Sequence, residues 1–142
     1  MGSEAAKQRG SEAGERRSSP SPVRTFRDLV AWQRAMELAE AVYRVTALFS
    51  PDERFGLTSQ MRRAAVSIPS NIAEGFGRQS RPEYLRYLRI ARGSLAELGT
   101  QIELACRVGL MQPEAQLGDL VEENARILSA LIRAIEAKER SE

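Results

Sequence analysis

Arginine is the residue type whose spacing in this sequence points to chemistry. Between Arg54 and Arg92, eight arginines face two glutamates, a local net charge of +6, whereas the whole chain carries +2. Seven of them follow one another along two predicted helices: Arg62, Arg63, Arg78, Arg81, Arg86, Arg89 and Arg92. Arginines can simply solvate a helix face while their stems cover apolar neighbours. So few acidic partners favour an anion-binding surface instead, with a phosphate backbone as its ligand.

The residue types that usually carry catalysis are scarce. Histidine is absent from the chain, and the single cysteine, Cys106, is expected to be a small buried residue near the edge of a helix seam. Ser67 and Ser70 lie in no nucleophile elbow, and the glutamates lack the Glu-x-x-His pairing of di-iron bundles. We therefore expect no enzyme, metal site or cofactor, and carboxylate-only chemistry is the remaining enzymatic alternative.

The composition is that of helices packed on helices. Apolar residues make up 42% of the chain, charged residues 28% and aromatic residues 6%. The sequence has neither an apolar run of membrane-spanning length nor a secretory signal, and with one cysteine we expect a cytoplasmic protein without a membrane partner. Residues 1–23 are predicted to be a disordered tail, and residues 24–140 the folded domain.

Apolar periodicity and capping signals predict four helices. The first runs from about Thr25 to Phe49, and the second opens at Ser50-Pro51 and is kinked near Val66 by Pro69. A capping box at Ser80 opens the third helix, which ends at Gly109, and the fourth begins near Pro113. Short links between helices of similar length predict an all-α, antiparallel up-down-up-down four-helix bundle with a kinked second helix.

The first helix carries two apolar stripes. The stripe predicted to be the buried seam contains Leu29, Trp32, Met36, Ala39, Tyr43 and Thr46. An adjoining stripe contains Ala31, Ala35, Leu38, Val42, Val45 and Phe49. Either the helix touches two neighbours within the bundle, or the extra stripe is a subunit interface. In the fourth helix, Asn124 is expected to be a hydrogen-bonded core amide, with a register-setting role as the alternative.

Residues 60–80, QMRRAAVSIPSNIAEGFGRQS, contain a basic pair, then Ser-Ile-Pro-x-Asn-Ile-Ala-Glu-Gly and an arginine. With flanking pieces such as Leu29-Val30-Ala31-Trp32 and Ala91-Arg92-Gly93-Ser94, the segment from Leu29 to Met111 resembles the 23S rRNA intervening sequence proteins, also called the bacterial four-helix bundle protein family. The hallmark residues Ser67, Pro69, Asn71, Glu74 and Gly75 are interpreted as architectural. Pro69 bends the helix, Asn71 and Glu74 satisfy the backbone groups that the bend frees, and Gly75 allows close approach.

The resemblance implies a four-helix protomer assembled into a homopentamer, with nucleic acid as the class of partner. Relatives include the accessory variability determinant of diversity-generating retroelements, a basic barrel that works with a reverse transcriptase and its RNA. Two features depart from the pattern: the long N-terminal tail, and a fourth helix that is net acidic.

The leading hypothesis is therefore a non-enzymatic oligomer that binds structured RNA or DNA through the seven arginines. The rival is a protein-interaction scaffold that docks acidic surfaces, such as those of a reverse transcriptase or a ribosome-associated protein.

Overall fold

Four long helices make up most of the structure, a computed structural model that describes residues 22–141. They are α2 (Val30–Thr46), α3 (Leu57–Phe76), α4 (Arg81–Arg107) and α5 (Ala115–Arg140). Two short 3-10 helices, η2 (Phe26–Asp28) and η3 (Pro51–Glu53), precede α2 and α3. No strand occurs within the described residues. The predicted tail, except for its last two residues, lies outside them.

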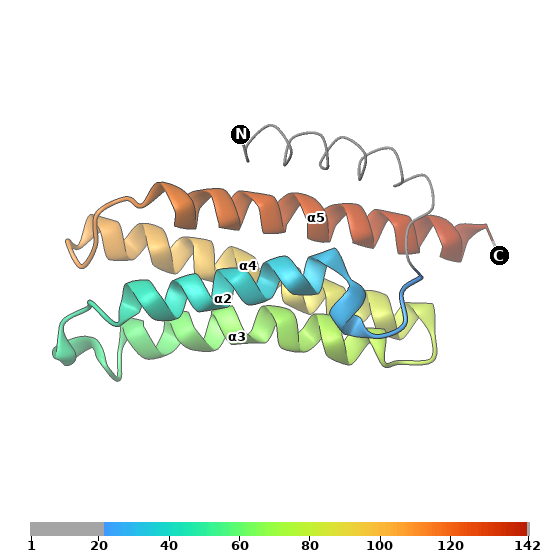
Figure 1. The fold of residues 1–142 in the computed structure, drawn as a ribbon, viewed down its shortest axis with the longest axis horizontal. Coiled ribbons are helices and arrows are strands. Elements are labelled where there is room, and N and C mark those ends of the chain that lie inside the picture. Colours follow the sequence, from blue (N-terminus) through green and yellow to red (C-terminus); the bar gives the residue numbers. More distant parts are fainter. Residues whose placement is uncertain (1–21, 142) are drawn as a thin grey trace, which may run out of the picture.

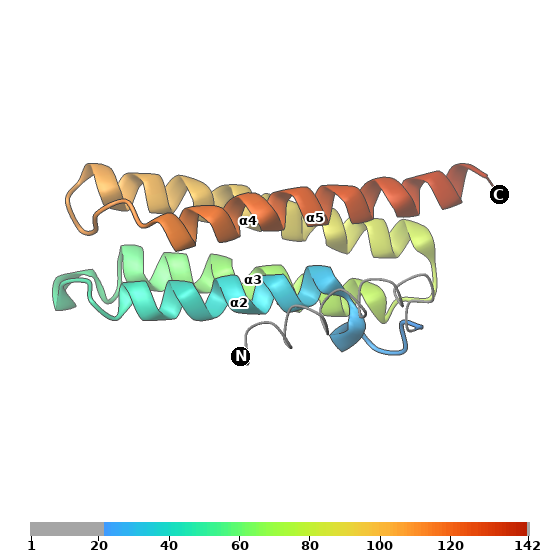
Figure 2. The ribbon, with the colours of Figure 1, turned by 45° about the horizontal axis from the view of Figure 1, so that its top comes forward.

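The helices form a closed square in which each packs against its neighbours in sequence and α5 packs back against α2. Successive helices are antiparallel, with α2 and α3 in one layer and α4 and α5 in the other (Figures 1 and 2). The connections 47–56 and 108–114 lie at one end of the bundle, and the short turn between α3 and α4 lies at the other. The predicted up-down-up-down four-helix bundle is confirmed.

Local capping chemistry explains where α4 begins and ends. The Ser80 hydroxyl accepts a hydrogen bond from the Glu83 backbone N–H at 3.3 Å, and a proline occupies the first turn. At the other end Gly109 adopts a φ of +83°, a left-handed conformation that glycine adopts without strain. These boundaries agree with those predicted.

The starts of the first two helices differ from the prediction. Thr25 caps the separate helix η2 instead of α2, because Leu29 is extended and interrupts the helical path. Likewise, Ser50-Pro51 opens only η3. α3 begins after Gly56, where the Glu53 carboxylate accepts a hydrogen bond from the Leu57 N–H at 3.1 Å. In both places the predicted capping residue therefore opens a short 3-10 helix. A non-helical residue, Leu29 or Gly56, then separates this short helix from the long one.

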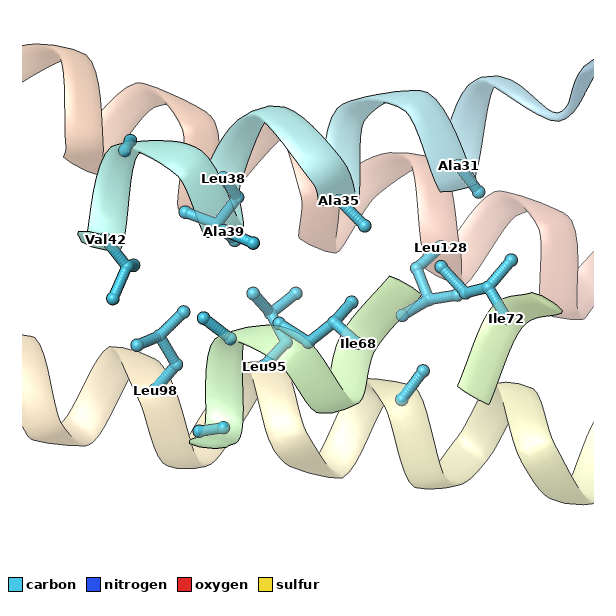
Figure 3. Packing of buried hydrophobic residues seen from close by; sticks show 14 of the residues in the cluster. Ala31, Ala35, Leu38, Ala39, Val42, Ile68, Ile72, Leu95, Leu98 and Leu128 are labelled. Atoms are coloured by element: carbon cyan, nitrogen blue, oxygen red, sulfur yellow. The ribbon is translucent and has the colours of Figure 1, made fainter. Parts of the chain in front are cut away.

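The small residues of α2 face the interior. Ala35, Leu38 and Val42 are fully buried and lie opposite side chains from the other three helices, among them Ile68, Leu98 and Leu128 (Figure 3). Of the stripe predicted to be the buried seam, Ala39 and Thr46 are buried, but Met36 and Tyr43 are 38% and 45% exposed, so the prediction is wrong for this outer part of the stripe. The buried alanines let neighbouring helices approach closely, whereas the bulky Trp32, Met36 and Tyr43 lie toward the outer face.

Asn124 is a buried polar residue whose side chain joins α5 to α2. Its Nδ2 donates to the backbone oxygen of Leu120 at 2.8 Å and to that of Arg34 at 3.2 Å. A buried amide is tolerated when its groups are hydrogen-bonded. Asn124 therefore has the environment of the hydrogen-bonded core amide that the sequence suggested.

The hallmark residues lie on α3, which continues through Pro69 to Phe76. Asn71 Nδ2 donates to the Ser67 carbonyl at 2.8 Å and to the Ser67 hydroxyl at 2.9 Å, whereas the carbonyl that loses its donor at Pro69 is four residues earlier, on Ala65. Glu74 pairs with Arg78 at 2.8 Å. Both side chains thus have partners other than those expected for them.

Gly75 lies at a close approach of α3 to α4. A Cβ atom at this position would lie 2.8 Å from the Tyr87 Cβ and 3.2 Å from the Tyr84 backbone oxygen. The obstacles are a backbone oxygen and the first side-chain carbon, neither of which can move without moving α4. Glycine at this position therefore sets the distance between the two helices.

We expect Gly75→Ala to lower the free energy of unfolding by about 1–3 kcal/mol, because the added methyl group must push α4 away. Gly93→Ala is the matched control: its Cβ would meet nothing within 4 Å, so the better helix propensity of alanine should stabilise the protein by up to about 1 kcal/mol. Urea denaturation followed by circular dichroism measures both. Equal stability of the two variants would contradict the close approach.

Candidate nucleic-acid interface

The seven predicted arginines lie along α3, α4 and the turn between them, but they do not form one continuous ridge. Arg62 and Arg63 are on the first half of α3, Arg78 is in the turn, and the other four are on α4. Their side chains have different partners, so the seven arginines differ in how available they are to an anion.

Arg62 points toward α2 and is half-buried. Its Nε donates to the Thr46 hydroxyl at 2.8 Å, and its guanidinium carbon lies 4.5 Å from the centre of the Tyr43 ring. Nη2 also donates to the Tyr43 backbone oxygen at 3.4 Å, near the C-terminal end of α2. A cation is favourable at the negative end of a helix dipole. Arg62 therefore fastens α3 to α2 and is less available to an external anion.

A cation–aromatic cluster occupies the α3–α4 turn. Arg78 and Arg86 both lie over the ring of Tyr87, at 4.9 and 4.6 Å from its centre. Arg78 donates to the Tyr87 hydroxyl at 2.7 Å and pairs with Glu74, while Arg86 pairs with Glu83 at 3.3 Å. The hydrogen bond and charge of Glu83 raise the pKa of Arg86. Two guanidinium groups are thus held around one aromatic ring.

The remaining arginines range from paired to unpaired. Arg89 reaches across to α5 and pairs with Glu136 at 2.7 Å, and Arg81 also interacts with a neighbouring group. Arg63 and Arg92 have no hydrogen-bond or ion-pair partner among residues 22–141. The exposed pairs are worth about 0–1 kcal/mol each, so a phosphate group can compete with the carboxylates. The surface is therefore partly neutralised.

An apolar groove lies on the outer side of α2 and α3, and sequence reasoning did not locate it. Its volume is about 580 Å³. Its lining comes from η2 and from the outer faces of both helices: Phe26, Trp32, Met36, Ala39, Glu40, Tyr43, Val66, Pro69, Ser70 and Ala73. The signal is present in the stripe that contains Trp32, Met36 and Tyr43, which the apolar spacing predicts to be the buried seam.

Two further properties concern the described residues alone. From residue 22 to 141, no group of three or more histidine, cysteine, aspartate or glutamate side chains is arranged to hold a metal ion. Over the same range, each helix is too short or too polar to cross a lipid bilayer.

Comparison with known proteins identifies relatives of this chain. A family model described as 23S rRNA-intervening sequence protein matches residues 27–133, which include α2, α3, α4 and most of α5. The chain is also similar in structure to a protein of unknown function of the S23 ribosomal protein family from Bacteroides thetaiotaomicron. The TM-score is 0.68 at 23% sequence identity, over 73% of this chain and 96% of that one. At this identity the likeness shows the shared fold. The search of curated proteins finds no match.

Tyr84, next to the cation–aromatic cluster, provides a pH test of the α3–α4 packing. Burial raises the pKa of Tyr84 to about 12, and its ring packs edge-on against Phe76 at 6.1 Å. In the unfolded chain the phenol ionises near pH 10. The stabilising contribution of the neutral phenol is therefore complete below pH 10 and is lost as the pH rises to about 12. Denaturation at pH 8 and pH 11 should show a larger loss of stability for the wild type than for Tyr84→Phe. Equal losses would contradict the assignment.

Proposed function

Because this chain belongs to the 23S rRNA-intervening sequence protein family, we propose that it is a non-enzymatic, oligomeric protein of the cytoplasm that binds nucleic acid. Structured RNA is the proposed ligand, and the proposed role is accessory to an RNA or reverse-transcriptase process. The arginines of α3 and α4 contact the phosphate backbone, and the shape of the RNA determines which molecules fit.

The observation that carries this proposal is the segregation of charge between the helices. Residues 54–92 hold eight arginines and two glutamates, whereas residues 113–142 hold seven acidic and four basic groups. The basic part of the molecule is therefore concentrated on α3, α4 and their turn. A concentrated positive surface attracts polyphosphate and raises its rate of association.

The side-chain partners suggest which arginines contribute most. Arg63 and Arg92 are exposed and lack partners within the described chain, so they can bind phosphate without giving up an existing bond. Arg78 and Arg86 must exchange an exposed carboxylate for a phosphate, which costs little. Arg62 would lose its contacts with Thr46 and Tyr43, so we expect it to contribute least.

Binding to a generic RNA hairpin should be strong at low salt and should weaken steeply as salt is added, because bound counterions are released from the phosphates. Replacing Arg86 and Arg89 with glutamate should reduce the slope of log K against log salt by about two or more. Arg126→Glu with Arg133→Glu makes the same charge change on α5 and should have a smaller effect. Absence of binding at low salt would refute the proposal and favour the protein-interaction scaffold.

The oligomer is proposed to form through the apolar groove between α2 and α3, with a second copy of this chain as its occupant. Trp32, Met36 and Tyr43 line this groove together with Val66 and Pro69 of α3. Such surfaces usually mark interaction sites. A contact between different faces of identical copies gives a ring when the rotation that it imposes closes, and a pentamer is the ring that the family resemblance implies.

Met36→Glu should dissociate the oligomer into monomers, because it places a charge without a partner among the residues that line the groove. The side chain is 38% exposed, so the monomer itself should keep its helical content. Leu48→Glu is the control, since Leu48 is 87% exposed and lies outside the groove. Light scattering after size-exclusion chromatography gives the masses. A Met36→Glu protein with the wild-type mass would exclude this interface.

A further inference from the structure

A second pocket, of mixed polarity, lies between α3 and α4 on the side of the bundle near the connection that precedes α3. Its volume is about 520 Å³, within the range of small-ligand sites. The lining residues come from that connection and from both helices: Phe55, Ser59, Gln60, Arg63, Ala64, Ser67, Ser94 and Glu97. The apolar groove shares no residue with this site, and Arg63 is the one member of the seven arginines that lines it.

The pocket contains two opposite charges that are not paired with each other. Arg63 of α3 and Glu97 of α4 both line it, yet across residues 22–141 neither has an ion-pair or hydrogen-bond partner. When two charged groups line one pocket and do not pair with each other, each can bind a different group of the same ligand. The guanidinium suits a phosphate, and the carboxylate accepts hydrogen bonds from N–H groups.

The floor of the pocket is fixed in place. The hydroxyl oxygens of Ser67 and Ser94 lie 2.8 Å apart and join α3 to α4 at this level. Asn71 also donates to the Ser67 hydroxyl at 2.9 Å. The hallmark residues Ser67 and Asn71 therefore hold the base of the pocket rigid, which lowers the entropic cost of binding a ligand there.

The rim carries an aromatic ring that the fold leaves in solvent. Phe55 is 85% exposed, and its ring contacts the Arg54 guanidinium, whose central carbon lies 4.7 Å from the ring centre. An exposed aromatic residue beside a cation is the combination on which unpaired bases stack in proteins that bind single-stranded nucleic acid.

We propose that this pocket binds a guanine nucleotide, either free or as an unpaired guanosine of an RNA. The base stacks on Phe55, Glu97 accepts hydrogen bonds from the adjacent N1–H and N2–H groups of guanine, and Arg63 contacts the phosphate. Among the four bases, guanine alone presents two neighbouring N–H donors on its pairing edge, which a carboxylate can accept together. For the RNA-borne guanosine, the inference rests on the proposed function and adds base recognition to it.

The test is a calorimetric titration of the full-length protein with guanosine monophosphate and adenosine monophosphate. Guanosine monophosphate should bind at least about tenfold more tightly. A second pair of probes, short oligouridines with one central guanosine or one central adenosine, separates the two sources of the base. Tighter binding of the guanosine oligonucleotide than of the mononucleotide assigns the pocket to RNA, and the reverse assigns it to free nucleotide.

Three variants test the individual contacts. Phe55→Ala should weaken guanosine monophosphate binding by about tenfold or more, whereas the equally exposed Leu48→Ala should not. Glu97→Gln should abolish the preference for guanine over adenine. Arg63→Ala should weaken binding of the monophosphate but not that of guanosine, and Arg126→Ala on α5 should leave both unchanged.

Equal affinity for the two mononucleotides, or affinity that Phe55→Ala and Glu97→Gln leave unchanged, would overturn the inference. Competition by inorganic phosphate as effective as that by guanosine monophosphate would do the same. The outcome is separable from that of the hairpin titration. A duplex hairpin that binds while every guanine probe fails refutes the pocket alone. Nucleotide binding without hairpin binding refutes only the phosphate-backbone proposal.

Discussion

The contact of α3 with α4 at Gly75 is the constraint on which the basic surface depends. Gly75 has no side chain, so nothing at this position collides with the Tyr87 Cβ or with the Tyr84 backbone oxygen. α3 and α4 can therefore lie close together here. That distance brings Arg78 within reach of the Tyr87 ring on the next helix. It also lets two short serine side chains, Ser67 and Ser94, meet between the helices. A wider spacing would separate both pairs.

The side of α3 that faces α2 and the side that faces α4 have different properties. α3 presents one side to α2, where Arg62 is used in the fold, and another to α4, where Arg63 faces a polar pocket. These two arginines are adjacent in sequence, so they point in directions about 100° apart on a helix. The net charge of a segment therefore overstates the charge that is available to a ligand, because one arginine can be bound within the fold while the next one faces outward.

The fold was predictable from the sequence because its determinants are local. The Ser80 cap, Gly109 and the apolar periodicity of α4 and α5 identify those helices without knowledge of the rest of the chain. The orientation of α2 was not predictable in this way, since both of its stripes have helical spacing. How much of each stripe is buried depends on how closely α3 and α5 approach. The polar pocket was hidden for a similar reason: Phe55 and Arg63 belong to one stretch of chain, but Glu97 comes from α4 and meets them only through the antiparallel register of α3 and α4.

The order in which the four helices contact one another affects how the chain folds. Three of the four contacts between long helices join consecutive helices, so they close short loops and can form early at small entropic cost. The fourth, between α5 and α2, joins segments roughly ninety residues apart, and the bond from Asn124 to the Arg34 carbonyl lies in it. A nascent chain can therefore assemble three helices as they are synthesised, and must wait for the last helix before the interior is sealed.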